Sequence, residues 1–191
     1  MNRLLAIGIV LACFPCYASG RQHVKAAPTH FGRSWWVDLS DQNASGFVDG
    51  YADCLPPRRK GKQPGWNVTS KAMAEEITDY YARHPQSQLL AGRVLLKVAA
   101  TTKGMPPSPG GEVYTNRHGY YDGLWWTQSR DNEQLGYVEG YLFCLGRLTS
   151  MSQAKRLADA VGAWYAAHSS REDRAIAYVL AEQMKQEKPA Q

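Results

Sequence analysis

Apolar residues recur along most of this chain at intervals of three or four positions, which is the spacing that places them on one face of an α-helix. The clearest stripes run through residues 70–83 and 150–168. They share aromatic clusters near their ends: Ile77, Tyr80 and Tyr81 in the first, and Val161, Trp164 and Tyr165 in the second. No segment of useful length alternates between apolar and polar residues as a half-buried strand does. The pattern therefore predicts an all-α fold.

A further helix is predicted before and after each of these stripes. The earlier helix covers residues 41–55, with Ser40 as its N-cap and a proline pair after it. The equivalent helix of the second copy covers residues 131–148. Ser150 and Gln153 form a capping-box pattern for the second stripe. The later helices follow His84-Pro85 and Ser169-Ser170, and their apolar residues are Leu89, Leu90, Val94 and Leu95 in one case and Ile176, Val179 and Leu180 in the other. The expectation is two units of three helices each.

The two units share a set of residue types at a constant spacing. The first set is Trp35, Trp36, Gly46, Gly50, Tyr51 and Cys54, and the second, 90 positions later, is Trp125, Trp126, Gly136, Gly140, Tyr141 and Cys144. Such self-similarity predicts a tandem duplication. The aromatic clusters match at an offset of 84 instead, so the second copy lacks six residues that the first has in the segment 56–69.

The duplication divides the chain into four parts. A signal peptide over residues 1–20 is followed by a first three-helix repeat over 21–100, a Gly/Pro-rich linker over 101–120 and a second repeat over 121–187. A unit of three helices buries little surface by itself. We therefore expect the two copies to fuse into one helical domain with pseudo-twofold symmetry, a dimer-like arrangement within a monomeric chain.

Paired glycines suggest how the copies meet. Gly46 and Gly50, like Gly136 and Gly140, stand four residues apart and so share a helix face. Glycine inside a helix costs about 1 kcal/mol relative to alanine, so the pairs need a packing reason. Close approach of the first helices of the two copies is the favoured one, by analogy with other small-residue contacts. The alternative is that each pair makes room for a bulky side chain within its own copy.

The first twenty residues have the parts of a secretory signal peptide. Arg3 supplies a basic start, residues 4–14 an apolar run, and small residues precede Arg21. The mature product is therefore expected in the periplasm or outside a bacterial cell. No other apolar run approaches the ~20 residues that span a bilayer, so no stable membrane insertion is expected.

Composition and charge exclude two classes of protein. Hydrophobic residues make up 44% of the 191 positions and charged residues 20%, a balance that argues against disorder. The formal charge of +5 falls to 21 − 17 = +4 when Arg3 leaves with the signal peptide. The cations do not form a stripe interleaved with stacking aromatics, so nucleic-acid binding is not expected.

Signal cleavage leaves two cysteines, Cys54 and Cys144. Because paired cysteines of exported proteins usually bond, a disulfide between them is predicted. A geometric argument opposes this prediction. In an antiparallel helix crossing centred on Gly50 and Gly140, the two cysteines would lie about 12 Å apart by helical rise, whereas a bond needs Cα atoms within about 7 Å. The sequence leaves both outcomes open.

Part of the first copy resembles the Rap/Tai family of type VI secretion immunity proteins. The resemblance covers roughly residues 45–100, with a weaker echo over 135–182, and its closest segments are Gly46-Phe47-Val48-Asp49-Gly50 and the run from Val68 through Tyr80-Tyr81-Ala82-Arg83-His84-Pro85 to Val98. Members of this family are small exported helical proteins that bind and neutralise cell-wall-cutting effectors in the periplasm, commonly as dimers. The resemblance implies a protein partner, and a fused duplication would imitate such a dimer.

Two groups of residues are candidates for binding that partner. A basic segment contains Arg58, Arg59, Lys60, Lys62 and Trp66. Its cations would steer and pair with an acidic partner, and its Trp would anchor it; the alternative is a solubilising loop. The aromatic pairs Trp35-Trp36 and Trp125-Trp126 would form a second surface for proteins, peptides or sugars, unless they are core residues.

The evidence for catalysis in the sequence is weaker. Asp49 and Glu139 could form an acid/base pair across the pseudo-twofold axis, as in glycosidases, but paired helical carboxylates are usually solvated or salt-bridged. His84 and His168 stand at equivalent helix ends, where capping is favoured over a metal site because zinc needs three or four ligands. No catalytic residue, metal or cofactor is predicted.

The sequence thus predicts an exported, non-enzymatic binding protein, with immunity against a secreted cell-wall-targeting effector as its leading function. The alternative is a cell-envelope protein that binds carbohydrate or peptidoglycan, or an enzyme acting on them, through the aromatic pairs and Asp49 with Glu139.

Overall fold

A computed structural model of the chain describes residues 31–55, 69–101 and 121–186. Within these ranges the chain forms eight α-helices, a short 3₁₀ helix and no strand, which confirms the predicted all-α fold. The α-helices are α1 (Arg33–Val37), α2 (Asp41–Cys54), α3 (Ser70–Arg83), α4 (Ala91–Thr101), α5 (Gly123–Gln128), α6 (Asp131–Cys144), α7 (Met151–Ala167) and α8 (Ile176–Gln186). The 3₁₀ helix covers Ser169–Arg171.

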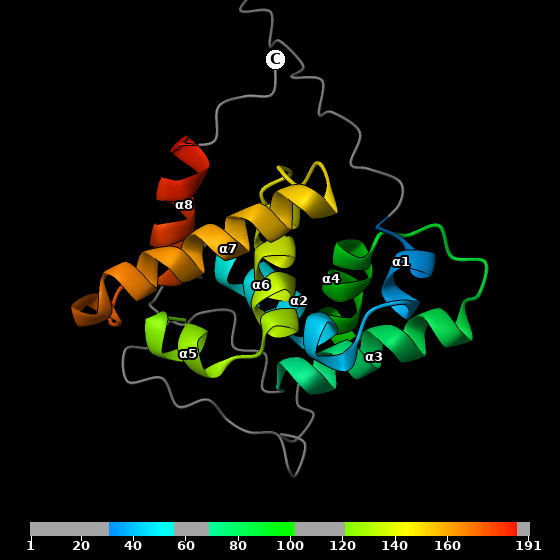
Figure 1. The fold of residues 1–191 in the computed structure, drawn as a ribbon. Helices are drawn as coiled ribbons and strands as arrows, with labels where there is room; N and C mark the ends of the chain where they lie inside the picture. Colours follow the sequence, from blue (N-terminus) through cyan, green and yellow to red (C-terminus); the bar gives the residue numbers. More distant parts are fainter. Residues whose placement is uncertain (1–30, 56–68, 102–120, 187–191) are drawn as a thin grey trace, which may run out of the picture.

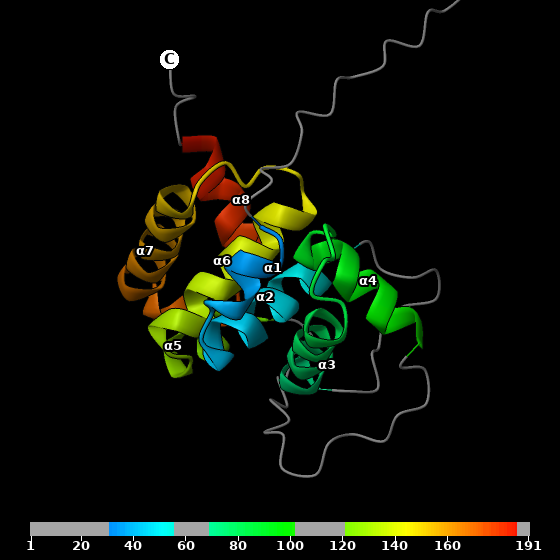
Figure 2. The same ribbon diagram turned by 90° about the vertical axis from the view of Figure 1, so that its right-hand side faces the viewer.

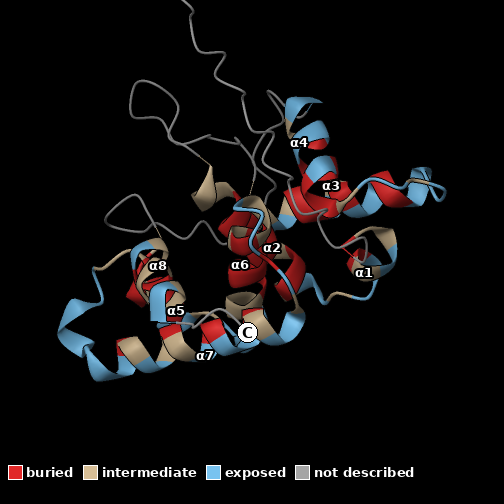
Figure 3. Cartoon of the chain, turned by 90° about the horizontal axis from the view of Figure 1, so that it is seen from above, coloured by how far each residue is buried: buried red, intermediate tan, exposed pale blue. Residues whose placement is uncertain are grey.

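Helices α2 and α6 lie together in the middle of the molecule (Figure 1). Helices α1, α3 and α4 lie on one side of this pair and α5, α7 and α8 on the other (Figure 1). The view turned by 90° likewise separates α3 and α4 from α5 and α7 (Figure 2). Buried residues concentrate in α2 and α6 and on the inner faces of α3 and α7, whose outer faces are exposed (Figure 3). The centre of the core is therefore the contact between α2 and α6.

Glycines bring the backbones of α2 and α6 into contact. A Cβ atom placed on Gly50 would collide with the carbonyl group of Tyr137, and one placed on Gly140 would collide with that of Phe47. In each case the distance from the added Cβ atom to the carbonyl oxygen would be under 3.0 Å, which real Cβ atoms essentially never show. This close contact confirms the helix crossing predicted from the glycine pairs.

The two helices of the crossing run parallel. Gly46 lies against the carbonyl of Glu133, and Gly50, four residues later, lies against the carbonyl of Tyr137, also four residues later. The partner's residue number therefore rises along both helices, whereas in an antiparallel pair it would fall. Gly136, against the carbonyl of Asn43, follows the same direction from the other side.

A disulfide joins the last residues of α2 and α6. The Cα atoms of Cys54 and Cys144 are 6.1 Å apart, which is within the range that a disulfide requires. The predicted bond is thus confirmed, and the argument that a glycine crossing excludes it is wrong. That argument assumed antiparallel helices; in a parallel pair the C-terminal ends stay together, so the crossing and the bond are compatible.

Side-chain caps fix where several helices begin. The Ser40 hydroxyl accepts a hydrogen bond from the Asn43 N–H at 3.2 Å, as its predicted N-cap role requires. The Ser150 hydroxyl accepts from the Gln153 N–H at 3.1 Å. Gln153 reaches back to the N–H of Thr149 at 2.9 Å, one residue before the cap, so the predicted capping box is displaced by one position.

Helix α6 ends at Cys144, four residues before the predicted end at residue 148. The reason is Gly146, whose φ of 66° is in the left-handed region. The Gly146 N–H donates to the Phe143 carbonyl at 3.0 Å and the Arg147 N–H donates to the Leu142 carbonyl at 2.9 Å, which is the Schellman pattern of a helix C-terminus.

Each side of the crossing has a short helix that the sequence did not predict, so the expectation of three helices per unit is wrong. Helices α1 and α5 carry the two Trp pairs and contain five and six residues, too few for a periodic pattern to show. The later helices also begin further along than predicted, at Ala91 and Ile176. Leu89, assigned to the apolar stripe of the first of these, precedes α4 and is exposed.

Several contacts occur once on each side of the crossing. In the first kind of contact, the N–H at the start of α4 donates to the carbonyl of the aromatic residue that precedes α1, and the N–H at the start of α8 does the same to the one that precedes α5. In the second kind, a buried Tyr of α3 donates its hydroxyl to a carbonyl before α4, and a buried Tyr of α7 does so to a carbonyl before α8. The bonds are Ala91 to Phe31 (2.9 Å), Ile176 to Tyr121 (2.9 Å), Tyr81 to Leu89 (2.8 Å) and Tyr165 to Arg174 (2.7 Å). The two sides are thus closed by the same kinds of bond.

Candidate functional site

Most of the surface of the two tryptophan pairs is in the core. Trp36, Trp125 and Trp126 are buried, and Trp35 is half-buried and packs against both hydrophobic clusters of the core. The indole N–H of Trp36 donates to the Thr78 hydroxyl at 3.0 Å, which ties α1 to α3. These positions match the core interpretation that the sequence left open, and they leave little indole surface for a partner.

The basic segment falls outside the described residues. Arg58, Arg59, Lys60, Lys62 and Trp66 all lie between residues 55 and 69, where the structure makes no statement. Their binding role therefore stays a prediction from sequence.

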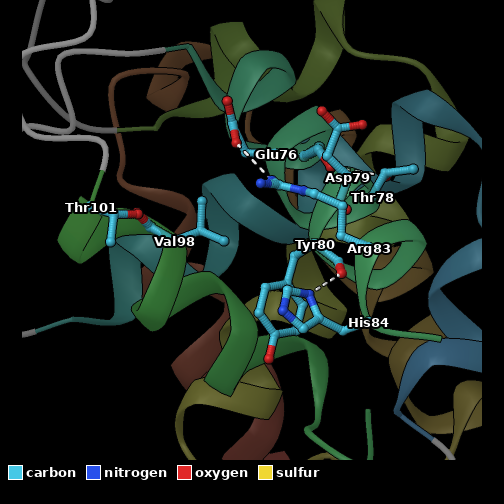
Figure 4. Close-up of polar contacts among 9 residues, drawn as sticks. Glu76, Thr78, Asp79, Tyr80, Arg83, His84, Val98 and Thr101 are labelled. Atoms are coloured by element: carbon cyan, nitrogen blue, oxygen red, sulfur yellow. Dashed lines mark hydrogen bonds and ion pairs between the residues drawn. The ribbon is translucent and has the colours of Figure 1, made fainter. Parts of the chain in front are cut away.

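The two histidines cap their helices in the same way. His84 stacks on Tyr80 with ring centroids 4.3 Å apart, and its Nδ1 donates to the Tyr80 carbonyl at 2.8 Å (Figure 4). His168 stacks on Trp164 at 4.4 Å and donates to that residue's carbonyl at 2.8 Å. Because a carbonyl only accepts, Nδ1 carries the proton in both rings. The predicted capping role is confirmed, and the described residues contain no group of three or more potential metal ligands.

Asp49 is buried in the second half of α2 and accepts hydrogen bonds from two hydroxyl groups. The hydroxyl of Ser70, the first residue of α3, and that of Tyr121, which precedes α5, both donate to its Oδ1. Burial raises the pKa of Asp49 to about 7, against the lowering effect of the two hydroxyls, and the negative charges of Glu133 and Asp53 raise it further. Asp49 thus connects three segments from both sides of the crossing.

A second acid one helical turn later adds to this arrangement. The Tyr137 hydroxyl of α6 donates to the Asp53 carboxylate of α2, and burial raises the pKa of Asp53. We call Asp49, Asp53, Tyr121 and Tyr137 the carboxylate–phenol cluster. Burial is also the main cause of the raised pKa of both tyrosines, so both phenols are neutral donors at physiological pH.

Glu139 stands 90 positions after Asp49 but has different surroundings. It is fully buried, and in the part of the chain that the structure describes neither carboxylate oxygen has a hydrogen-bond partner at normal geometry. Burial raises the pKa of Glu139 to about 8, and the Asn43 side chain of α2 opposes this rise. A buried carboxyl with this pKa is mostly uncharged at neutral pH.

The structure does not bring Asp49 and Glu139 together. Asp49 interacts with Ser70 and Tyr121, Glu139 lies beside Asn43, and neither acid contributes to the pKa shift of the other. Two-carboxylate glycoside hydrolysis requires both groups to flank one bond. Among the described residues this pair has no such shared site.

Sequence reasoning missed the carboxylate–phenol cluster. The available signal was the spacing of Asp49 and Asp53, which puts both acids on one face of the helix. Their partners Tyr121 and Tyr137 are more than 70 positions away in sequence, and no local pattern relates them to the acids. The cluster is built of groups that satisfy one another, which fits a network that fixes how the helices meet.

Replacing Tyr121 with Phe tests the strength of this network. Tyr121→Phe should lower the free energy of unfolding by about 1–3 kcal/mol at pH 8, because a buried and ionised Asp49 loses a donor. The pKa of Asp49 should also rise. Urea denaturation followed by circular dichroism measures the first effect. Tyr178→Phe, which removes the same hydroxyl from an exposed position, should change stability by less than about 0.5 kcal/mol. Equal losses in both variants would contradict a role for the network.

Comparison with known proteins adds no assignment. No protein-family model, curated protein or solved structure matches the chain significantly. Of the helices in the described ranges, none is long and apolar enough to cross a membrane. Function must therefore be argued from the residues themselves.

Proposed function

We propose that this chain is an exported, non-enzymatic binding protein of the bacterial cell envelope. The observation that carries the proposal is the disulfide between Cys54 and Cys144 at the central helix crossing. Structural disulfides belong to oxidising compartments, and residues 1–20 have the pattern of a secretory signal peptide. The packing also supports binding over catalysis, because the buried acids Asp49 and Asp53 accept hydrogen bonds that join separate segments of the fold.

The proposal includes the origin of the fold. The two sides of the crossing descend from a duplicated unit, and α2 and α6 are the equivalent helices related by a pseudo-twofold axis. In support, both helices contain 14 residues and begin and end 90 positions apart. The histidine caps, the tyrosine hydroxyl bonds and the glycine contacts recur on both sides as well. A duplicated unit that forms its own internal dimer presents one composite surface for one partner.

The partner that we propose is a protein, specifically a secreted effector that cuts the cell wall. The support is the resemblance of residues 45–100 to Rap/Tai immunity proteins, which act in the periplasm and are commonly dimers. The basic segment of residues 58–62 with Trp66 is the proposed contact, since the Trp pairs are largely buried. Its cations suit an acidic cleft.

Replacing the four cations of this segment tests the proposal. The bait is the protein purified from the periplasm, and the readout is the affinity of the protein that it captures in stoichiometric amount. The variant carries Ser at Arg58, Arg59, Lys60 and Lys62. It should keep the helical circular dichroism and the melting temperature but bind more weakly, most clearly at low salt, because added salt screens the attraction between opposite charges.

The matched control removes the same charge elsewhere. Lys71, Arg93, Arg130 and Arg147 are exposed and distributed over four helices or helix ends, and their replacement by Ser should leave affinity within about threefold of the parent. If the segment variant binds as tightly as the control, the basic segment is not the contact. If no protein is captured, the binding function itself fails.

One observation favours the enzymatic alternative. Asp49, with a pKa of about 7, accepts a hydrogen bond from the Ser70 hydroxyl at the start of α3, and a pKa near the working pH suits a general base. Under this alternative the purified protein would act on peptidoglycan or glycans, and Asp49→Asn would abolish that activity. Under the binding proposal Asp49→Asn leaves capture of the partner unchanged.

A further inference from the structure

Three buried side-chain oxygens at the central crossing make no hydrogen bond of normal geometry within the described residues. They are the two carboxylate oxygens of Glu139 on α6 and the Oδ1 atom of Asn43 on α2. Glu139 has no exposed surface, and Asn43 is 6% exposed. Buried acceptors of this kind are costly unless a proton or donor is supplied.

The equivalent acid on the other side of the crossing has the hydroxyl donors that Glu139 lacks. Asp49 receives hydroxyl bonds from Ser70 and Tyr121. The positions that correspond to these donors by the offsets of 84 and 90 residues are Ala154 and Phe31, which are buried and have no hydroxyl. One side therefore carries donors for its acid, and the other side carries apolar residues.

No charged side chain of the packed helices compensates Glu139. The helices in main contact with α6 are α2, α4 and α7. Their charged residues are Asp41, Asp49 and Asp53 on α2, Arg93 and Lys97 on α4, and Lys155, Arg156 and Asp159 on α7. Those of α4 and α7 are exposed, and Asp49 and Asp53 are bonded to hydroxyl groups. The pKa of Glu139 responds only to burial and to Asn43.

We propose that Glu139 is a pH-sensitive element of the crossing: in the folded protein it is the neutral acid, and loss of its proton at alkaline pH loosens the contact between α2 and α6. Protonation removes the buried charge and supplies a proton at one of the three buried oxygens. Ionisation instead places a charge on a fully buried side chain of α6, at the crossing with α2, and a buried charge without a counter-charge is costly.

The direction of the pH dependence follows from linkage. Burial raises the pKa of Glu139 from 4.5 in the free residue to about 8 in the folded protein. Between these values the folded chain keeps a proton that the unfolded chain loses, so stability is greatest below the lower value and falls as pH rises to the upper one. Within this window the unfolding equilibrium constant should increase about tenfold per pH unit through Glu139 alone.

Glu139→Gln isolates this contribution, because the amide has the shape of the acid, carries its own donor and does not titrate. Urea denaturation of both proteins from pH 5 to 9 gives the ratio of their unfolding constants. The ratio of wild type to variant should rise by about a hundredfold or more between pH 5 and 8 and then level off. Asp49→Asn, measured in parallel, should keep the part of the pH dependence of the unfolding constant that comes from Glu139. A ratio that stays constant with pH would overturn the proposal.

A spectroscopic measurement tests the same point without relying on the variant's stability. Carbon-13 labelling of glutamate carboxyl groups in the wild type should show one side chain that is protonated at pH 6.5 and titrates near pH 8. Glu139→Gln, or Glu139→Met if the first variant does not fold, identifies it. Hydrogen exchange at pH 9 should be faster in α6 and α7 of the wild type than in the variant. If every glutamate is ionised at pH 6.5, Glu139 is not a neutral acid.

Discussion

Gly50→Ala and Gly140→Ala should each lower the free energy of unfolding by about 3 kcal/mol or more. The added methyl group would stand against the carbonyl of Tyr137 or of Phe47 in the facing helix. Those atoms belong to helical backbone and cannot turn aside as a side chain could, so the crossing itself has to open. Urea denaturation followed by circular dichroism measures the loss.

Gly162→Ala is the matched control. Gly162 lies within α7, and the nearest atom to an added methyl group is Nε1 of Trp126 at 3.4 Å, an ordinary contact. Alanine is the better helix former, so this variant should gain about 1 kcal/mol. If Gly50→Ala and Gly140→Ala behave like Gly162→Ala, the close crossing of α2 and α6 is wrong.

Removal of the disulfide should have an effect of similar size. The bond closes a loop of 90 positions, and in the chain-entropy treatment such a cross-link contributes about 4.6 kcal/mol by restricting the unfolded chain. The double variant Cys54→Ser with Cys144→Ser should lose this amount in urea denaturation. Reduction of the wild type should reproduce the loss and leave the double variant unchanged. A wild type as stable when reduced as when oxidised would contradict the prediction.

The sequence was sufficient for the longer helices. Helix α3 has the predicted bounds of residues 70–83, and α2 ends at Cys54, within one residue of its prediction. Apolar periodicity and side-chain caps are local signals, and both act here in agreement with the final packing. Helices α1 and α5 had no comparable signal, because a helix of one or two turns is held by the core that covers its Trp pair.

The direction of the central crossing could not be taken from the glycines. Two glycines four residues apart mark the same helix face whether the partner runs parallel or antiparallel. The cysteines indicate the direction, since Cys54 and Cys144 both follow the glycines at the C-terminal ends of their helices. A bond between them requires those ends to meet, which only the parallel arrangement allows.

The chemistry of the candidate site was predicted less well. The sequence favoured solvated or salt-bridged side chains for Asp49 and Glu139, and this expectation is wrong, because both are buried with a raised pKa. Their separation and unequal surroundings depend on Ser70, Tyr121 and Asn43, which come from other segments of the fold. Burial and tertiary partners decide the state of an acid, and neither can be obtained from the spacing of two residues.

The parallel crossing of α2 and α6, closed by a disulfide, is the central claim, and mapping of the cysteine linkage in the exported protein tests it most directly. Proteolysis without reduction followed by mass spectrometry should recover one cross-linked pair of peptides, one containing Cys54 and the other Cys144, and no free thiol at either position. Recovery of Cys54 and Cys144 as free thiols would contradict the disulfide that closes the crossing and remove the main support for an exported binding protein.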